Sequence, residues 1–208
     1  MNERIPIVLD RKIMNSLSLH ELDKYYKNVI SGEYFIKSAG PYNNSQGEHY
    51  RLLAYLSMLI DSHTVVDIGT YTGLSALALS YNENNRIITY DIEDCFTKYS
   101  PNIITPKNKK NIEFRIGDCR KDVDLFKNTN FVVLDVDPHD GKQEVEFFKF
   151  FEEINYEGIV VLDDIYINYD MEEFWKNIKQ EKHDVMRYGH WSGTGIVQFG
   201  NKFNIILN

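Results

Sequence analysis

The sequence has little of what marks secreted, membrane-spanning or nucleic-acid-coating proteins. Its 208 residues contain only two cysteines, Cys95 and Cys119, which cannot build the disulfide framework of a small secreted domain. No stretch approaches the roughly 18 apolar residues that a membrane span needs. No apolar run follows the first four residues, so we expect no signal peptide, no membrane partner and a cytoplasmic protein.

Positive charges are fewer than negative charges. Lysine and arginine number 23 against 31 aspartates and glutamates, and the formal net charge is -8 at pH 7. Broad nucleic-acid binding depends on neutralising phosphates, which an acidic chain does poorly. The basic cluster at 107–110 is short and is interpreted as a solvated loop. We therefore expect no nucleic-acid partner.

The spacing of apolar residues divides the chain into two parts, residues 1–61 and residues 62–208. Residues 1–61 are predicted to be helical, because capping boxes begin at Ser18 and Ser45 and apolar residues follow each at helical spacing. We predict that this N-terminal helical extension serves as a substrate lid. Whether the extension also mediates a homodimer is left undecided by the sequence. A chain of this length forms one substantial core.

From residue 62 to residue 208 the pattern is that of an α/β domain. Short β-branched runs alternate with helical segments, and the runs are apolar on both faces, which predicts a parallel sheet covered by helices on both sides. The expected strands are 64–68, 86–90, 112–116, 131–134 and 158–162. Three further extended runs, 184–188, 195–199 and 203–207, have no helix between them, so at least one must be antiparallel.

The sharpest local signal is the run Asp67-Ile-Gly69-Thr70-Tyr71-Thr-Gly73. A strand ends at an acid, turns over glycines and enters a helix, which exposes backbone N–H groups to a ligand. In the dinucleotide fingerprint a middle glycine lets a pyrophosphate approach. Tyr71 stands there instead, so the predicted ligand is a nucleoside without a pyrophosphate. Asp67 suits a cationic ligand group, such as the amino end of a methionine moiety.

The next two strands also end in acids. Asp91, followed by Ile92, lies about 20 residues beyond the turn, where a carboxylate accepts both ribose hydroxyls. Asp118 and Cys119 follow the third strand and are placed to border an adenine. Ligands of such sheets sit outside the carboxyl ends of the strands, so these residues predict one nucleoside site.

A second acidic group follows strands four and five. Asp135 and Asp137 precede His139, and Asp163 and Asp164 end the next strand. Carboxylates that converge repel one another unless a cation neutralises them, and hard oxygen ligands suit Mg²⁺ or Ca²⁺. The alternative is that the later pair caps the following element and that Asp135 only touches the nucleoside ligand.

The run from Asp67 to Leu79 resembles motif I of class I S-adenosylmethionine (SAM)-dependent methyltransferases. It is most similar to small-molecule O-methyltransferases of the catechol and caffeoyl-CoA type, and the similarity covers roughly residues 45 to 200. The resemblance implies a Rossmann-like sheet of order 3-2-1-4-5-7-6 with strand 7 antiparallel, formed by residues 62–208. It also implies that residues 69–73 line the methionine part of SAM, Asp91 holds the ribose, and Asp118 and Cys119 flank the adenine.

The same resemblance implies a divalent metal, Mg²⁺, held by Asp135, Asp163 and Asp164. Two departures from the family pattern matter: Asp164 replaces an asparagine, and Pro138 stands where the catechol-type enzymes have a lysine. His139 is the nearest substitute and is predicted to be the catalytic general base. Sugar and macrolide O-methyltransferases have an Asp-x-Asp-His pattern here, which leaves the choice of ligand between Asp135 and Asp137 open.

Aromatic residues near glycines are the predicted acceptor contacts. Tyr42 lies in a loop before the second capping box, and His190 and Trp191 lie in a glycine-rich segment before the final strands. A plain hairpin loop is the alternative for that later segment.

Together these features predict a SAM-dependent methyltransferase that methylates a hydroxyl of a small molecule with help from a divalent metal. A metal-independent methyltransferase of the same fold and a non-catalytic SAM-binding protein are the alternatives. A nicotinamide oxidoreductase is disfavoured by Tyr71 and by the strands at the end of the chain.

Overall fold

The computed structural model describes residues 3–23, 25, 27–28, 49–60, 62–95, 98, 103–104, 109–189 and 191–208. Two predicted acceptor contacts, Tyr42 and His190, lie outside these residues, as do the Ser45 capping box and the start of the basic cluster. No helix within the described residues is long and apolar enough to cross a membrane.

The centre of the described structure is a sheet of seven strands. Their order is β6-β4-β3-β7-β8-β10-β9, which is the predicted order 3-2-1-4-5-7-6. The strands are β3 (Thr64–Ile68), β4 (Arg86–Asp91), β6 (Ile112–Ile116), β7 (Phe131–Leu134), β8 (Gly158–Leu162), β9 (Glu181–Asp184) and β10 (Gly195–Phe199). β10 runs antiparallel to both of its neighbours, β8 and β9, and the other pairings are parallel. The prediction of the fold is confirmed.

Helices cover both faces of this sheet because successive strand residues point to opposite sides. Val65 and Phe131 pack in a core with α4 (Tyr50–Leu59) and α5 (Leu74–Leu79). Val66 and Val132 pack in a second core with α7 (Val123–Lys127), α8 (Lys142–Glu153) and α9 (Tyr169–Asn177). The second core holds a dense group of aromatic rings: Phe126, Phe147, Phe148, Phe150, Phe151, Tyr156, Phe174, Trp175 and Phe199.

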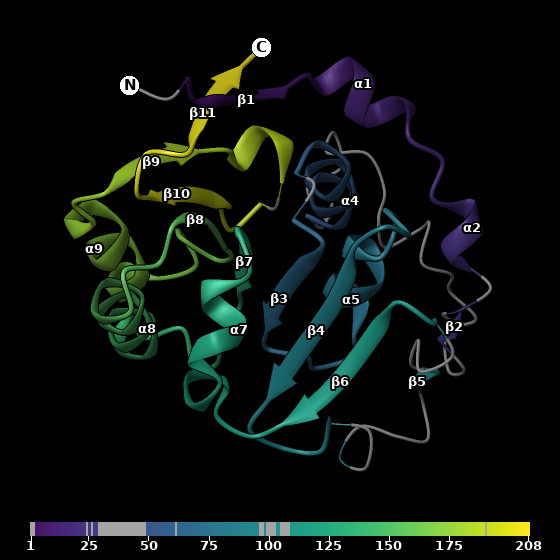
Figure 1. The fold of residues 1–208 in the computed structure, drawn as a ribbon, viewed down its shortest axis with the longest axis horizontal. Coiled ribbons are helices and arrows are strands. Elements are labelled where there is room, and N and C mark those ends of the chain that lie inside the picture. The colour runs from purple at the N-terminus through teal and green to yellow at the C-terminus, as the bar shows by residue number, and fades with distance from the viewer. Residues whose placement is uncertain are drawn as a thin grey trace.

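The N-terminal extension is helical only in part. β1 (Ile5–Leu9) is a strand that pairs in parallel with β11 (Phe203–Leu207), outside the main sheet and beside both ends of the chain (Figure 1). Ile7 and Leu9 are buried, whereas Pro6 is exposed and Val8 is half-buried, which is the alternation of a strand. The partner strand lies about 200 residues away, so local helical spacing gave no sign of the pairing.

Short helices follow β1. α1 (Arg11–Ser16) begins at Asp10, whose side chain accepts a hydrogen bond from the Ile13 N–H at 2.9 Å. The predicted helix behind Ser18 is described as α2 (His20–Asp23), and β2 (Lys27–Asn28) follows and pairs with β5 (Ile103–Ile104). Later in the chain, the expected strand at 184–188 is shifted: β9 ends at Asp184 and a 3₁₀ turn covers Met186–Tyr188.

One core joins the extension to the α/β part of the chain. Leu9 and Met14 belong to the same buried cluster as Leu53 and Val65. The Tyr55 hydroxyl also donates a hydrogen bond to the carbonyl of Val8 at 3.0 Å. The division at residues 61 and 62 and the lid role stay predictions.

Candidate active site

One pocket, with a volume of about 650 Å³, lies at the carboxyl ends of β3, β4, β6, β7 and β8. Most of the predicted site residues line it: Gly69, Tyr71, Asp91, Ile92, Asp118, Cys119, Asp135, His139, Asp163 and Asp164. A second hollow of about 670 Å³ is lined by α8, α9 and the segments beside them and touches no strand end. The pocket at the strand ends is therefore the candidate site.

The turn after β3 is held in an unusual backbone conformation. Gly69, Tyr71 and Gly73 all have positive φ, at 103°, 43° and 78°. A Cβ atom on Gly69 would lie 1.6 Å from the carbonyl oxygen of Asp135. A glycine is thus required here by the close approach of the neighbouring strand end, in addition to any approach of a ligand.

Asp91 ties the end of β4 to this turn. Its Oδ2 accepts a hydrogen bond from the Tyr71 N–H at 3.2 Å, and its Oδ1 accepts one from the Glu93 N–H at 3.1 Å. A carboxylate offers about four lone-pair positions, so two backbone bonds leave capacity for ligand hydroxyls. Cys95 lines the same wall, and burial, followed by the neighbouring Asp91, raises the pKa of its thiol to about 12.

Three of the predicted cofactor contacts, Asp67, Thr70 and Gly73, are not among the residues that line the pocket. Asp67 Oδ2 accepts hydrogen bonds from the hydroxyls of Thr89 at 2.7 Å and Ser75 at 2.9 Å. Thr70 Oγ1 lies 2.8 Å from Thr89 Oγ1. Asp67 Oδ1 is buried and has no hydrogen-bond partner among the described residues. Burial raises the pKa of Asp67 to about 6, although both hydroxyls oppose the shift.

Replacing Asp67 with asparagine should change how stability depends on pH. A raised pKa in the folded state means that the contribution of Asp67 is full below pH 4 and is lost as the pH rises through about 6. The amide of the D67N variant would not ionise. The free energy of unfolding of D67N should therefore lose less between pH 4.5 and 7 than that of the wild type, by roughly 2 kcal/mol. Urea unfolding at several pH values measures this difference.

Asp124, an exposed carboxylate on α7, supplies the control for that experiment. D124N should follow the wild-type pH dependence. Parallel curves for D67N and the wild type would contradict the prediction.

The predicted adenine end is built from Asp118, Cys119 and two residues that the sequence did not single out. Arg120 binds the Asp118 carboxylate through Nε at 2.9 Å and Nη2 at 3.0 Å, which lowers the pKa of that carboxyl. The guanidinium also lies 5.2 Å from the centre of the Phe147 ring. Burial raises the pKa of the Cys119 thiol to about 12. This wall therefore presents an aromatic ring and neutral sulfur.

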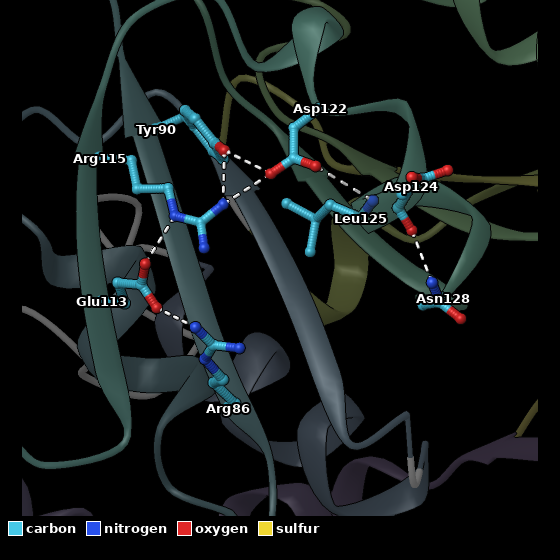
Figure 2. Close-up of polar contacts among 8 residues, drawn as sticks. All are labelled: Arg86, Tyr90, Glu113, Arg115, Asp122, Asp124, Leu125 and Asn128. Atoms are coloured by element: carbon cyan, nitrogen blue, oxygen red, sulfur yellow. Dashed lines mark hydrogen bonds and ion pairs between the residues drawn. The ribbon is translucent and has the colours of Figure 1, made fainter.

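A network of polar contacts links Tyr90, Arg115 and Asp122 (Figure 2). Tyr90 lines the pocket, and its hydroxyl donates to Asp122 Oδ2 at 3.1 Å and accepts from Arg115 at 2.8 Å. Arg115 also binds Asp122 at 2.7 Å and Glu113 at 2.6 Å. Because Asp122 caps α7 through the Leu125 N–H, the network joins three elements behind one side of the pocket.

Carboxylates surround His139 at the opposite end of the pocket. Its Nε2 lies 3.8 Å from Asp135, 3.5 Å from Asp137 and 3.6 Å from Asp164. His139 has a φ of 54°, and its carbonyl accepts a hydrogen bond from Asn168 Nδ2 at 2.8 Å. Burial and then the neighbouring Asp163 raise the pKa of Asp135. Local backbone strain of this kind is common at functional sites.

Asp164 links this end of the pocket to the segment before β10. It has a φ of 57°, and its Oδ1 accepts a hydrogen bond from the Ser192 hydroxyl. Trp191, a predicted acceptor contact, is 56% exposed and is not among the residues that line the pocket. Neither acid caps the next helix, because α9 begins at Asn168, whose side chain bonds the Met171 N–H.

Asp163 turns toward a buried histidine that the sequence did not point to. His49 stands just before α4, and its Nδ1 lies 3.2 Å from Asp163 Oδ1. The side chains are only 3% and 8% exposed. A histidine before an apolar helix carries no sequence pattern that marks it, and its importance comes from the tertiary contact alone.

The predicted metal ligands do not fit a divalent ion in this arrangement. Within the part of the chain that the structure describes, no group of three histidine, cysteine, aspartate or glutamate side chains is placed to hold a metal. Asp163 contacts His49, and one oxygen of Asp164 is occupied by Ser192. Asp163 and Asp164 are thus each engaged by another side chain, whereas a hard cation needs oxygens that converge on one point.

Structural comparison defines the fold class. A methyltransferase from Geobacter sulfurreducens matches with a TM-score of 0.57 and 11% identity, over 95% of this chain and 98% of that one. The O-methyltransferase TomG from Streptomyces achromogenes, solved with SAM, matches with a TM-score of 0.51 and 14% identity, over 73% and 79%. A candidate caffeoyl-CoA O-methyltransferase from Staphylococcus aureus gives 0.51 and 13%, over 72% and 83%. The fold is that of the Rossmann-like methyltransferases.

Sequence comparison identifies the family. The profile of the O-methyltransferase family matches residues 33–188, about three quarters of the chain, whereas no curated protein matched the sequence. The chain belongs to the O-methyltransferase family. The predicted family and the predicted enzyme class are confirmed.

Proposed function

We propose that this protein binds SAM in the pocket at the strand ends and transfers its methyl group to a hydroxyl of a small molecule. The observation that carries the proposal is that one pocket joins the turn after β3, Asp91 and the wall at Asp118 to the polar end at His139. The volume, about 650 Å³, lies within the range of small-molecule sites. The Streptomyces achromogenes relative was solved with SAM, which supports the choice of ligand.

The residues present suit the cofactor. The Asp91 carboxylate, with lone pairs left after its two backbone bonds, would accept the ribose hydroxyls. Phe147 and Cys119 would border the adenine, and the turn at Gly69 and Tyr71 would line the methionine part. SAM, when bound, supplies a methyl group on a positively charged sulfur that is already electrophilic. The chain then has to align an oxygen with that group and exclude water.

His139 would receive the acceptor proton. Its Nε2 lies within 3.8 Å of Asp135, Asp137 and Asp164, and the side chain lines the pocket, which supports this role. The proposed acceptor contacts include Trp191, which is exposed. They also include Tyr42 and His190, which lie outside the residues that the structure describes. The acceptor is proposed to be a small hydroxylated molecule, and no step is assigned to a metal because the predicted ligands do not converge.

Isothermal calorimetry with SAM and with S-adenosylhomocysteine tests the binding half of this proposal. We expect one molecule of either compound to bind per chain. Absence of heat with both would refute the proposal. Release of S-adenosylhomocysteine across a panel of hydroxylated compounds tests the catalytic half. Binding without release across the whole panel would instead favour a non-catalytic SAM-binding protein.

A further inference from the structure

A chain of buried hydroxyl groups holds the turn after β3 from the side away from the pocket. Thr70 lies in that turn, and its Oγ1 is 2.8 Å from Oγ1 of Thr89 on β4. The Thr89 hydroxyl donates a hydrogen bond to Asp67 Oδ2 at 2.7 Å. All three side chains are buried, so little water competes for these bonds and a missing partner would be costly.

The carboxylate at one end sets the direction of the chain. A carboxylate oxygen accepts, so the hydrogen of the Thr89 hydroxyl points to Asp67. A hydroxyl has only one hydrogen, so Thr89 meets Thr70 with its lone pairs and the Thr70 hydroxyl is the donor. The side chain of Thr70 is therefore committed to the protein, which agrees with its absence from the pocket lining.

The strand β4 thus contacts two consecutive residues of the turn. Thr89 and Asp91 are two residues apart, so their side chains project to the same side of the strand. Thr89 engages the side chain of Thr70, and Asp91 accepts a hydrogen bond from the Tyr71 N–H at 3.2 Å. Asp91 is also oriented by the Glu93 N–H at 3.1 Å, a bond that does not involve the turn.

We propose that Thr89 is a positioning residue of the cofactor site, which acts through Thr70 to hold the turn at 69–73 in the shape that the methionine part of the cofactor needs. The identity of that cofactor rests on the proposed function. Thr89 is not among the residues that line the pocket, so it acts only through the turn. Without its hydroxyl, Thr70 would keep a buried donor without an acceptor, and the turn would shift to bring that donor to water.

Calorimetry with two ligands that share adenine and ribose tests the proposal. S-adenosylhomocysteine carries the amino-acid part, whereas methylthioadenosine lacks it. T89V removes the hydroxyl and nearly keeps the volume of the side chain. We expect T89V to bind S-adenosylhomocysteine about tenfold more weakly and methylthioadenosine within about twofold of the wild type. A general loss of structure would weaken both ligands alike, so the ratio of the two dissociation constants is the informative quantity.

Two variants serve as controls. T89S keeps the hydroxyl and should bind both ligands as the wild type does. Thr129 is a buried threonine whose hydroxyl donates to the carbonyl of Thr64 at 2.6 Å, at the end of β3 far from the turn. T129V loses a hydroxyl of the same kind and should also bind both ligands as the wild type does. Thermal unfolding shows which variants are folded.

The variant T70V breaks the same bond from its other end and replaces T89V if that variant does not fold. It should show the same selective loss of S-adenosylhomocysteine binding. The double variant T70V/T89V should bind no more weakly than the weaker of the two single variants, because one bond can be lost only once. Losses that add in the double variant would contradict the proposal.

The ligand pair also separates this proposal from the proposed function. A wild type that binds neither ligand would refute the proposed function itself. A wild type that binds both, together with a folded T89V or T70V that weakens both equally or changes neither, would overturn the role of Thr89 and leave the cofactor site in place.

Discussion

Replacing Gly69 with alanine should lower the free energy of unfolding by more than about 4 kcal/mol. The new Cβ would lie 1.6 Å from the carbonyl oxygen of Asp135, which is backbone and cannot turn aside. The φ of 103° also lies in a region that side chains with a Cβ avoid. Either β7 or the turn must shift, and both form the floor on which the proposed cofactor rests. Urea unfolding of the purified variant measures the loss.

Gly117 offers a matched control for that variant. It also lines the pocket and has a positive φ of 130°, but a Cβ there would meet nothing within 4 Å. G117A should therefore cost only the backbone strain, about 1–3 kcal/mol. Equal losses for G69A and G117A would show that the approach of Asp135 is not what demands a glycine.

Replacing Asp91 with alanine should weaken binding of S-adenosylhomocysteine by at least about a hundredfold. Two hydrogen bonds from ribose to a charged acceptor would be lost, each worth about 1.5–3 kcal/mol. The variant also loses the bonds that hold the Tyr71 and Glu93 N–H groups, so the turn itself loosens. Calorimetry gives the dissociation constants, and thermal unfolding confirms that D91A is folded.

Asp118 tests whether this effect is specific to the ribose position. Its carboxylate is already bound by Arg120 through two contacts, so it has less to offer a ligand. D118A should weaken binding less than about tenfold. Unchanged binding in D91A would remove the basis of the proposed cofactor site.

The sheet was predictable because its signals are local. Runs such as Thr64–Ile68 and Gly158–Leu162 are apolar on both faces, and only a covered parallel sheet buries both sides. Val65 and Val66 illustrate this, since each lies in a different core. The strand β1 was not predictable in this way, because five residues with a partner at the far end of the chain carry little information of their own.

The site residues show the same contrast between local signals and contacts made only in the fold. The acids at strand ends could be found from the sequence, because parallel strands bring their carboxyl ends to one edge. Which way each acid points depends on contacts that no spacing encodes. His49, before α4, contacts Asp163, and Ser192, before β10, donates a hydrogen bond to Asp164. Arg120 and Phe147 likewise join the pocket only through the fold.

The pairing of β1 with β11 limits when the fold can be completed during synthesis. Residues 5–9 are made well before the strand that pairs with them, 203–207. Until then Ile7 and Leu9 have no strand beside them, although both are fully buried in the completed protein. Contacts that span most of a chain form late. The seven-stranded sheet can therefore assemble before β1 is paired, and β1 finds its strand partner only once β11 has been made.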